Sequence, residues 1–292
     1  MTVTKALPTS GRYEPALEPS KSHASAEPHH IEISVVLPCL NEEASVAGCI
    51  ASIQEALDPL GKAYEVIVVD NGSSDASAAR AGAAGARVVH EPVAGYGSAC
   101  RAGLKAAHGR YLVWGDADGT YDFSSLPDLV ALLEGHDLVI GNRLAGEIEP
   151  GAMPWTHRRI GTPFLTGVVN ALFGAEIGDI NCGIRGISRA AYSRLNPGAN
   201  GMEFASELVV KAVQRELSIA QIPVDYRRRH GGEVKLRTWS DGWRHLRLVV
   251  GSWVSQGRRP VPAAPVVVLS AGPDVPVDLR TAEEPDADRL RL

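Results

Sequence analysis

Short apolar segments alternate with helix-like segments along residues 33–140, and this alternation restricts the fold more than any other feature of the sequence. Five short apolar runs predict buried strands, over residues 33–37, 65–69, 87–90, 111–114 and 137–140. The stretches between them predict helices, over residues 42–57, from Asp75 onward, and over 97–107 and 126–133. Such alternation is typical of a mostly parallel sheet with helices on both faces. We therefore expect an α/β fold in a single domain.

The two ends of the sequence differ in composition from the middle. Residues 1–30 are rich in Pro, Ser, Ala, Glu and His without apolar periodicity, and from about Gly257 the chain becomes Pro- and Ala-rich. Segments of this composition bury too little apolar surface to fold. We expect a disordered tail over 1–30, a folded domain over 31–255 and a mostly disordered tail over 256–292, in which a short apolar patch cannot fold alone.

Composition and charge exclude several classes of protein. The 292 residues are 45% hydrophobic and 22% charged, which is a globular balance, and the net charge of −5 gives no support for nucleic-acid binding. No apolar stretch reaches the length of a membrane span, and the first 30 residues lack the apolar centre of a signal peptide. The four cysteines form no CxxC pair. We expect a cytoplasmic protein with reduced thiols.

Acidic and amide side chains follow three of the predicted strands at the point where each ends. They lie in residues 38–42, 70–75 and 115–119. Ligands of open parallel sheets bind beyond the carboxyl ends of the strands. One Asp after a strand is commonly a turn former or a helix cap. Three such segments at one sheet edge instead favour a ligand site.

Asp116 and Asp118 are the most specific of these acidic residues. Two carboxylates two positions apart, directly after a buried strand, can hold one hard divalent cation, Mg²⁺ or Mn²⁺. The remaining coordination positions can then accept phosphate oxygens. The chemical use of such a cation would be to neutralise a diphosphate leaving group.

A glycine-rich segment, residues 95–100, resembles a dinucleotide-binding GxGxxG motif only in part. Cys100 occupies the third glycine position, and the segment follows the third predicted strand instead of the first. A dinucleotide cofactor is therefore not expected. A glycine loop at a helix N-terminus can still approach a ligand closely.

Eight ordered motifs carry a resemblance to a known family. The segments PCLNEE, VIVVDNGSSD, GYGSACRAGL and WGDADGTYDF resemble those of family 2 glycosyltransferases, which have the GT-A fold. The segments GDINCGIRGISR, GMEFASELVVKA, IPVDYRRRHGGEVKL and RTWSDGWRHLRLVV resemble the branch that contains dolichyl- and polyprenyl-phosphate sugar synthases. The resemblance covers about residues 33–250. It implies a metal-dependent, inverting transfer of a hexose, glucose or mannose, from a nucleoside-diphosphate sugar to a polyprenyl phosphate.

The resemblance also implies roles for individual residues. The expected donor-binding residues are Pro38, Asn41, Glu42, Asp70, Asn71, Gly97, Asp116 and Ala117. The expected catalytic residues are Asp118, Arg185, Glu207, Arg229 and Lys235, of which the arginines and the lysine would contact phosphates near the acceptor. Asp116 and Asp118 would bind the metal. The sequence departs from the family pattern at Asn71, where Asp is more common, and at Thr120, where some relatives have Gln.

The residue pattern is compatible with two classes of acceptor, a lipid phosphate and a sugar hydroxyl. Seven arginines and lysines between Asp225 and Val250 form a basic region, which is either a solvated loop or a contact for an anionic acceptor. An ionised lipid phosphate needs no general base, whereas a sugar hydroxyl needs a carboxylate to accept its proton. The candidates for that base are Asp179, Glu203 and Glu207. A non-catalytic sugar-nucleotide-binding protein is a further alternative.

Apolar residues recur at helical spacing along residues 160–173, after the basic segment 155–159. Such a stripe belongs either to the core or to a helix that lies at a membrane surface. Relatives often continue beyond the WRHL segment into transmembrane helices, whereas this sequence continues into a polar tail. We therefore expect at most peripheral contact with the cytoplasmic face of a membrane.

Overall fold

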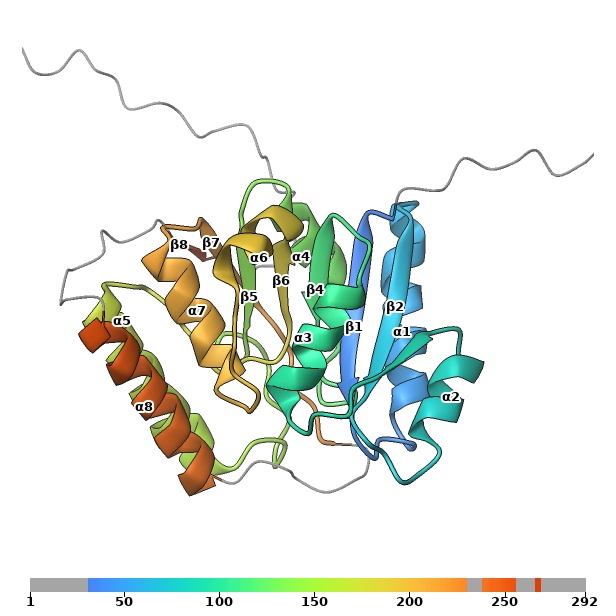
Figure 1. The fold of residues 1–292 in the computed structure, drawn as a ribbon, viewed down its shortest axis with the longest axis horizontal. Coiled ribbons are helices and arrows are strands. Elements are labelled where there is room, and N and C mark those ends of the chain that lie inside the picture. Colours follow the sequence, from blue (N-terminus) through green and yellow to red (C-terminus); the bar gives the residue numbers. More distant parts are fainter. Residues whose placement is uncertain (1–30, 230–237, 256–265, 269–292) are drawn as a thin grey trace, which may run out of the picture. The chain divides into compact units, whose positions relative to one another are not determined.

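The computed structural model describes residues 31–229, 238–255 and 266–268 (Figure 1). The predicted tail 1–30, most of the predicted tail 256–292, and Lys235 lie outside the described residues. The strands are β1 Ile33–Cys39, β2 Tyr64–Asp70, β3 Arg87–His90, β4 Tyr111–Trp114, β5 Leu138–Asn142, β6 Arg185–Ser188, β7 Ile219–Pro223 and β8 Val266–Val268. In the described chain they form one sheet in the order β3-β2-β1-β4-β6-β5-β7-β8.

The sheet is parallel except at β6, which runs antiparallel to both of its neighbours, β4 and β5. The carboxyl ends of the other strands therefore meet at one edge, and β6 begins at that same edge. The register places Pro38 beside Val69 and Cys39 beside Asp70, so the residues that follow β1 and β2 leave the sheet together.

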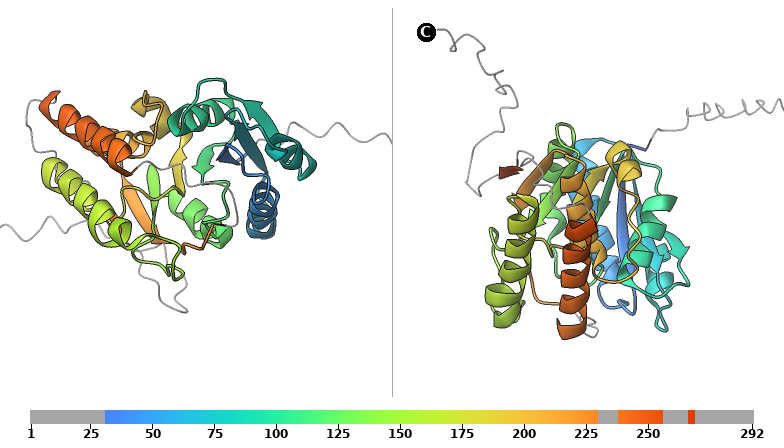
Figure 2. Two further views of the ribbon diagram at one scale, coloured as in Figure 1. Left: turned by 90° about the horizontal axis from the view of Figure 1, so that it is seen from below. Right: turned by 60° about the vertical axis from the view of Figure 1, so that its left-hand side comes forward.

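The helices are α1 Val46–Leu57, α2 Ser77–Ala83, α3 Tyr96–Ala106, α4 Leu126–Leu133, α5 Thr162–Phe173, α6 Arg189–Leu195, α7 Phe204–Gln214 and α8 Thr238–Ser255. Three short helical turns are η1 Asp58–Leu60, η2 Phe123–Ser125 and the π-helical η3 His157–Gly161. Figures 1 and 2 show α1 and α4 on one face of the sheet, and α3, α6 and α7 on the other. The expected α/β architecture with helices on both faces is therefore confirmed.

The core lies between the sheet and these helices. The central strands β1 and β4 are buried along almost their whole length, as are the inward sides of α1 and α4. Parallel strands covered on both faces read as continuous apolar runs, which is why the sequence pattern predicted them well. Gly103 of α3 is required by close packing, because a Cβ there would lie 2.3 Å from a methyl of Val36.

Three strands were not predicted from the sequence. β6 and β7 are short, and half of β6 is Arg and Gly, which depresses the apolar signal of the run. The segment of β8, assigned to the C-terminal tail, instead pairs in parallel with β7. An apolar patch too short to fold alone becomes a strand when an existing sheet edge supplies its hydrogen-bond partners.

No helix among the described residues combines the length and the apolar character needed to span a bilayer.

Candidate active site

The loops that follow β1 and β2 are tied together. Asn41 has a φ of 52°, a left-handed conformation that Asn tolerates better than most residues, and its N–H donates to the Ser73 hydroxyl over 3.0 Å. The side-chain oxygen of Asn41 accepts from the N–H of Ser74 over 2.8 Å. The N–H of Glu42 donates to the Ser77 hydroxyl over 2.8 Å. These bonds fix the loop that carries Glu42.

The loop after β4 carries the two expected metal ligands. One carboxylate oxygen of Asp118, Oδ1, accepts from the N–H and the hydroxyl of Thr120, over 3.0 Å and 2.6 Å, which is an Asx-type turn. The carbonyl of the buried Ala117 accepts from the Ser45 hydroxyl over 2.8 Å. The loop is thereby anchored to the start of α1, and the three strand-end segments converge on one edge as predicted.

The surroundings of Asp116 disfavour the ionised form of its carboxyl. Burial, followed by repulsion from Asp118, raises the pKa of its carboxyl to about 7, although Arg143, a hydrogen bond from Tyr96 and Arg229 each act to lower that pKa. The negative charge of Asp118 therefore disfavours ionisation of Asp116. A cation placed between them would remove that repulsion.

The segment after β7 runs beside the loop after β4. Tyr226 forms an isolated bridge with Tyr121, and their rings meet edge to face with centroids 5.2 Å apart. The N–H of Arg227 donates to the carbonyl of Thr120 over 2.8 Å. This pairing brings Arg229, which is 111 positions from Asp118 in the sequence, to the acidic loop.

Arg229 pairs with two acidic residues from different loops. Its guanidinium donates to Oδ2 of Asp118 over 3.0 Å and also forms an ion pair with Glu42. The Glu42 and Asp118 side chains are both largely buried, so their charges are weakly screened. Arg229 thus supplies positive charge at the place where the sequence predicts a metal–diphosphate site.

The carboxylates of Asp116 and Asp118 suit a divalent cation. Their oxygens are the donors that Mg²⁺ and Mn²⁺ prefer, and burial together with the neighbouring Asp118 raises the pKa of Asp116, so a cation bound there would favour its ionised form. No group of three or more acidic, histidine or cysteine ligands is gathered within the described ranges. Water and diphosphate oxygens would therefore complete the coordination of a cation held by this pair.

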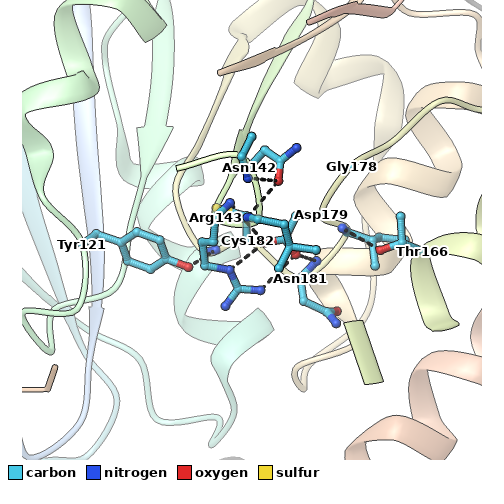
Figure 3. Close-up of polar contacts among 12 residues, drawn as sticks. Tyr121, Asn142, Arg143, Thr166, Gly178, Asp179, Asn181 and Cys182 are labelled. Carbon is cyan, nitrogen blue, oxygen red and sulfur yellow. Dashed lines mark hydrogen bonds and ion pairs between the residues drawn. The ribbon is translucent and has the colours of Figure 1, made fainter. Parts of the chain in front are cut away.

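Arg143, which acts to lower the pKa of Asp116, forms a buried ion pair with Asp179 (Figure 3). Nε and Nη2 of Arg143 donate to the two carboxylate oxygens of Asp179 over 2.6 Å and 2.9 Å, and the guanidinium stacks 5.2 Å from the ring centroid of Tyr226. Figure 3 shows Tyr121 on the other side of Arg143. The sequence analysis missed Arg143, although it follows the fifth predicted strand and the same strand-end rule would have found it.

Asp70 is the last residue of β2 and lies at the carboxyl edge of the sheet. Its carboxylate accepts from the N–H of Ser73 over 3.1 Å and lies 3.2 Å from Nδ1 of His90. It therefore shapes the loop after β2 while remaining at the predicted donor side of the site.

Asn71 holds a loop in place with its whole side-chain amide. Its nitrogen donates to the carbonyls of Glu91 and Val93, each over 2.8 Å, and its oxygen accepts from the N–H of Gly95 over 2.8 Å. The amide orders the segment that leads into α3. An Asp could not donate the first two bonds, which explains Asn at this position.

Arg185 has a different place from the one expected. It is 1% exposed, and its guanidinium donates to the carbonyls of Ile180, Cys182 and Ala205 over 2.5, 2.8 and 2.7 Å. These bonds hold the segment that leads into β6 against α7. Because the guanidinium is enclosed and hydrogen-bonded by backbone, we correct the expected phosphate contact to a structural role.

Glu207 is also occupied by structural contacts. Its carboxylate accepts from the N–H groups of Gly198 and Ala199, the latter over 2.7 Å, and pairs with Lys211 over 2.7 Å. Burial alone would raise its pKa, but Lys211 and the two N–H groups together lower it. A low pKa and a full set of donors disfavour a proton-accepting role, so the expectation of catalysis by Glu207 is also corrected.

Gly97 faces protein instead of a ligand. A Cβ at this position would lie 2.4 Å from the carbonyl of Ala199 and 2.8 Å from Cβ of Phe204. The glycine is required because the first turn of α3 packs directly on the segment before α7. The structure thus shows a packing role for Gly97, and the donor contact expected of it stays a prediction.

Of the three candidate bases, Glu203 is the one whose carboxylate has an oxygen without a hydrogen-bond partner among the residues described. Its Oε1 accepts from the N–H of Gly201 over 3.3 Å, while its buried Oε2 has no hydrogen-bond partner among the residues described. Asp179 is paired with Arg143 and Glu207 is fully occupied.

Comparison with known proteins agrees with this geometry. The family model of glycosyl transferase family 2 matches residues 34–195. The chain is 40% identical over 220 residues to the low-salt glycan biosynthesis hexosyltransferase Agl6 of Haloferax volcanii, covering 75% of this chain and only 53% of Agl6, about half its length. It is 32% identical over 212 residues to a dolichyl-phosphate hexose transferase of the same organism, covering 72% of this chain and 89% of that protein.

A solved structure shares the fold. Glucosyl-3-phosphoglycerate synthase from Mycobacterium tuberculosis, in complex with Mn²⁺, uridine diphosphate and glucosyl-3-phosphoglycerate, superposes with a TM-score of 0.60 at 26% identity. The match covers 76% of this chain and 80% of that one. The expected GT-A fold is confirmed, and the chain belongs to glycosyl transferase family 2.

Proposed function

We propose that this protein transfers a hexose from a nucleoside-diphosphate sugar to the phosphate of a polyprenyl phosphate, with inversion at the sugar carbon. The observation that carries the proposal is the acidic pair at the end of β4, which faces Arg229 and lies beside Glu42. The similarity to a dolichyl-phosphate hexose transferase supports a lipid-phosphate acceptor. Uridine diphosphate in the structural relative supports a UDP-sugar as the first donor to test.

The proposed reaction breaks the bond between the sugar carbon and the diphosphate and forms one to an acceptor oxygen. Mg²⁺ or Mn²⁺ held by Asp116 and Asp118 would neutralise the negative charge on the departing diphosphate. Arg229 lies where its guanidinium can pass from the carboxylates to phosphate oxygens. Arg143 favours the ionised form of Asp116, which is the form a cation requires.

An ionised acceptor phosphate is already a nucleophile, so this reaction requires no protein base. A reaction without a protein base agrees with a site in which the carboxylates of Asp179 and Glu207 are both engaged by hydrogen-bond donors. Catalysis would depend on positioning and charge neutralisation. The acceptor would be reached from the cytoplasmic face of a membrane.

A second candidate is transfer to a hydroxyl of a soluble phosphorylated acceptor. It is favoured by the structural relative, whose name specifies a glucosyl-3-phosphoglycerate product. A hydroxyl nucleophile needs a base, and Glu203 is the candidate because its buried Oε2 has no hydrogen-bond partner among the residues described. Substitution Glu203→Gln would abolish transfer in this case and leave lipid-phosphate transfer within about threefold.

The donor is tested first by thermal shift with UDP-, GDP- and dTDP-sugars, each with and without Mn²⁺. We expect the sugar nucleotide of one of these nucleosides to raise the melting temperature of the protein, and only when Mn²⁺ is present. Labelled donor is then offered to a polyprenyl phosphate or to 3-phosphoglycerate. Label in the lipid supports the first candidate, and label in the soluble acid supports the second. Donor binding without transfer to either would contradict both and favour a non-catalytic binding protein.

A further inference from the structure

The outward face of α5 carries apolar side chains that no other described part of the protein covers. Phe164 is 61% exposed, Ile160 at the end of η3 is 55% exposed, and Trp155 just before η3 is 67% exposed. Continuing from Ile160 and Phe164 at helical spacing, Gly167 and Ala171 are exposed as well. The inward residues of the helix, in contrast, are buried. The α5 stripe predicted from the sequence is therefore divided between a core face and an exposed face.

The outward face of α8 repeats the same spacing. Trp243, which is 65% exposed, Arg247, Val250 and Val254 are all exposed and lie at i, i+4, i+7 and i+11. The inward face contacts α7, where His245 is hydrogen-bonded to the Ser206 hydroxyl over 2.6 Å. The helix is thus attached by one side and shows an apolar stripe on the other.

The two helices lie side by side (Figure 2) and contact each other. Both also pack against α7, so the faces turned away from α7 are neighbours. We call the exposed residues of these two faces, together with Trp155, the α5/α8 surface. Contiguous exposed apolar side chains of this kind mark a binding surface more often than scattered ones do.

The charged residues described on the α5/α8 surface are all positive. Arg158, Arg159, Arg244 and Arg247 are exposed, and the sequence contains no Asp or Glu over residues 151–175 or 242–273. The whole protein has a net charge of −5, so this absence of acidic residues is local. Exposed tryptophans with arginines beside them are complementary to the boundary between lipid headgroups and acyl chains, where anionic headgroups attract the arginines.

A second copy of this chain is a poorer occupant of the surface. A symmetric dimer formed through it would place arginines against arginines without an intervening carboxylate from either segment. An anionic bilayer supplies the negative charge that the surface lacks.

We propose that the α5/α8 surface docks the protein onto an anionic lipid bilayer, with Trp155, Phe164 and Trp243 inserted at the interface. As the route to a membrane acceptor it rests on the proposed function, but docking itself is measurable without turnover. The bound orientation would present one outer layer of the fold to the membrane without any segment crossing it.

The test is vesicle flotation of the full chain, with neutral phosphatidylcholine vesicles and with vesicles that contain about 30% phosphatidylglycerol. We expect binding to the anionic vesicles, at least tenfold weaker binding to the neutral ones, and loss of binding at high salt. The variant Phe164→Ser/Trp243→Ser should bind at least tenfold more weakly. The variant Arg158→Gln/Arg159→Gln should lose most of the salt-dependent part.

Matched controls separate docking from general loss of charge or apolar surface. Val93→Ser removes an exposed apolar side chain elsewhere, and Lys105→Gln/Arg194→Gln removes two exposed charges elsewhere. Both should bind vesicles like the unmodified chain, and all variants should keep its melting temperature. Quenching of tryptophan fluorescence by brominated lipid should be strong in the unmodified chain and weaker in Trp243→Phe.

Three outcomes would overturn docking: equal binding to neutral and anionic vesicles, unchanged binding by the Phe164 and Trp243 variant, or a dimer in light scattering that this variant abolishes. Transfer to a short polyprenyl phosphate in detergent is measured in parallel. Transfer without vesicle binding would reject docking alone. Vesicle binding without transfer to any polyprenyl phosphate would reject the lipid acceptor alone.

Discussion

Two charged regions, one in the loop after β4 and one on α7, use the same residue types in opposite ways. Around Asp116 and Asp118, carboxylates repel each other and are balanced by a side chain, Arg229, from a distant segment. Around Glu207, a carboxylate is matched by backbone N–H groups and by Lys211 one turn away on the same helix.

The difference separates replaceable partners from permanent ones. Side-chain cations can be exchanged for a metal ion or for substrate charges, whereas backbone N–H groups cannot leave without unfolding the segment that carries them. The acidic loop after β4 is therefore suited to ligand binding, and the contacts of Glu207 and Arg185 are suited to holding the fold together. Four experiments test this distinction.

The largest effect is expected from Asp118→Asn. Transfer should fall by at least about 100-fold because one of two metal-binding carboxylates is lost, while the melting temperature changes by only a few degrees. Steady-state transfer assays and calorimetry measure the two quantities. Asp128→Asn, the same change at an exposed position of α4, is the control and should keep full activity. Unchanged transfer in Asp118→Asn would exclude a metal role for this residue.

Arg185→Met should act on stability. Three buried carbonyls lose a charged donor, so the free energy of unfolding should fall by about 3 kcal/mol. Urea unfolding measures the loss, and Arg194→Met on the surface should cost less than about 0.5 kcal/mol. If Arg185→Met instead kept full stability and abolished transfer, the structural role assigned here to Arg185 would be wrong.

Glu207→Gln should have a smaller effect of the same kind. Its charge-assisted hydrogen bonds weaken, which should lower the free energy of unfolding by about 1–2 kcal/mol. Transfer per folded molecule should stay within about threefold of the unmodified chain. A hundredfold loss of transfer with normal stability would return Glu207 to the catalytic set.

The carboxyls of Asp116 and Glu207 should also give opposite pH dependences of the free energy of unfolding. The pKa of Asp116 is raised to about 7, so its ionisation disfavours folding and its contribution is lost as pH rises from about 4 to 7. Asp116→Asn should therefore gain stability relative to the unmodified chain across that window, by at most about 1.4 kcal/mol per pH unit.

The pKa of Glu207 is lowered, so its contribution is present above an ordinary Glu pKa of about 4.3 and is lost as pH falls below it. Glu207→Gln should therefore approach the stability of the unmodified chain in acid. Unfolding curves between about pH 2 and pH 7 for both variants cover both windows and decide the matter. Parallel pH profiles would contradict the contrast between the two regions.

The apolar pattern was enough to predict most of the sheet. The five predicted strands correspond to β1–β5, and β1, β2, β4 and β5 were readable because largely buried strands read as continuous apolar runs. β6 could not be read this way, since its first residues are the buried Arg185 and a glycine. β8 could not either, because a three-residue strand exists only beside a completed sheet edge.

The sequence by itself determined the fold class, the acidic loop after β4 and its place at the carboxyl edge, because strand direction and residue order follow from local pattern. Only the tertiary structure decided which charges meet. Arg229 reaches Asp118 through the pairing of Tyr226 with Tyr121, and Arg185 is tied to α7 through the carbonyl of Ala205. Electrostatic partners depend on separations in space, which local sequence does not specify.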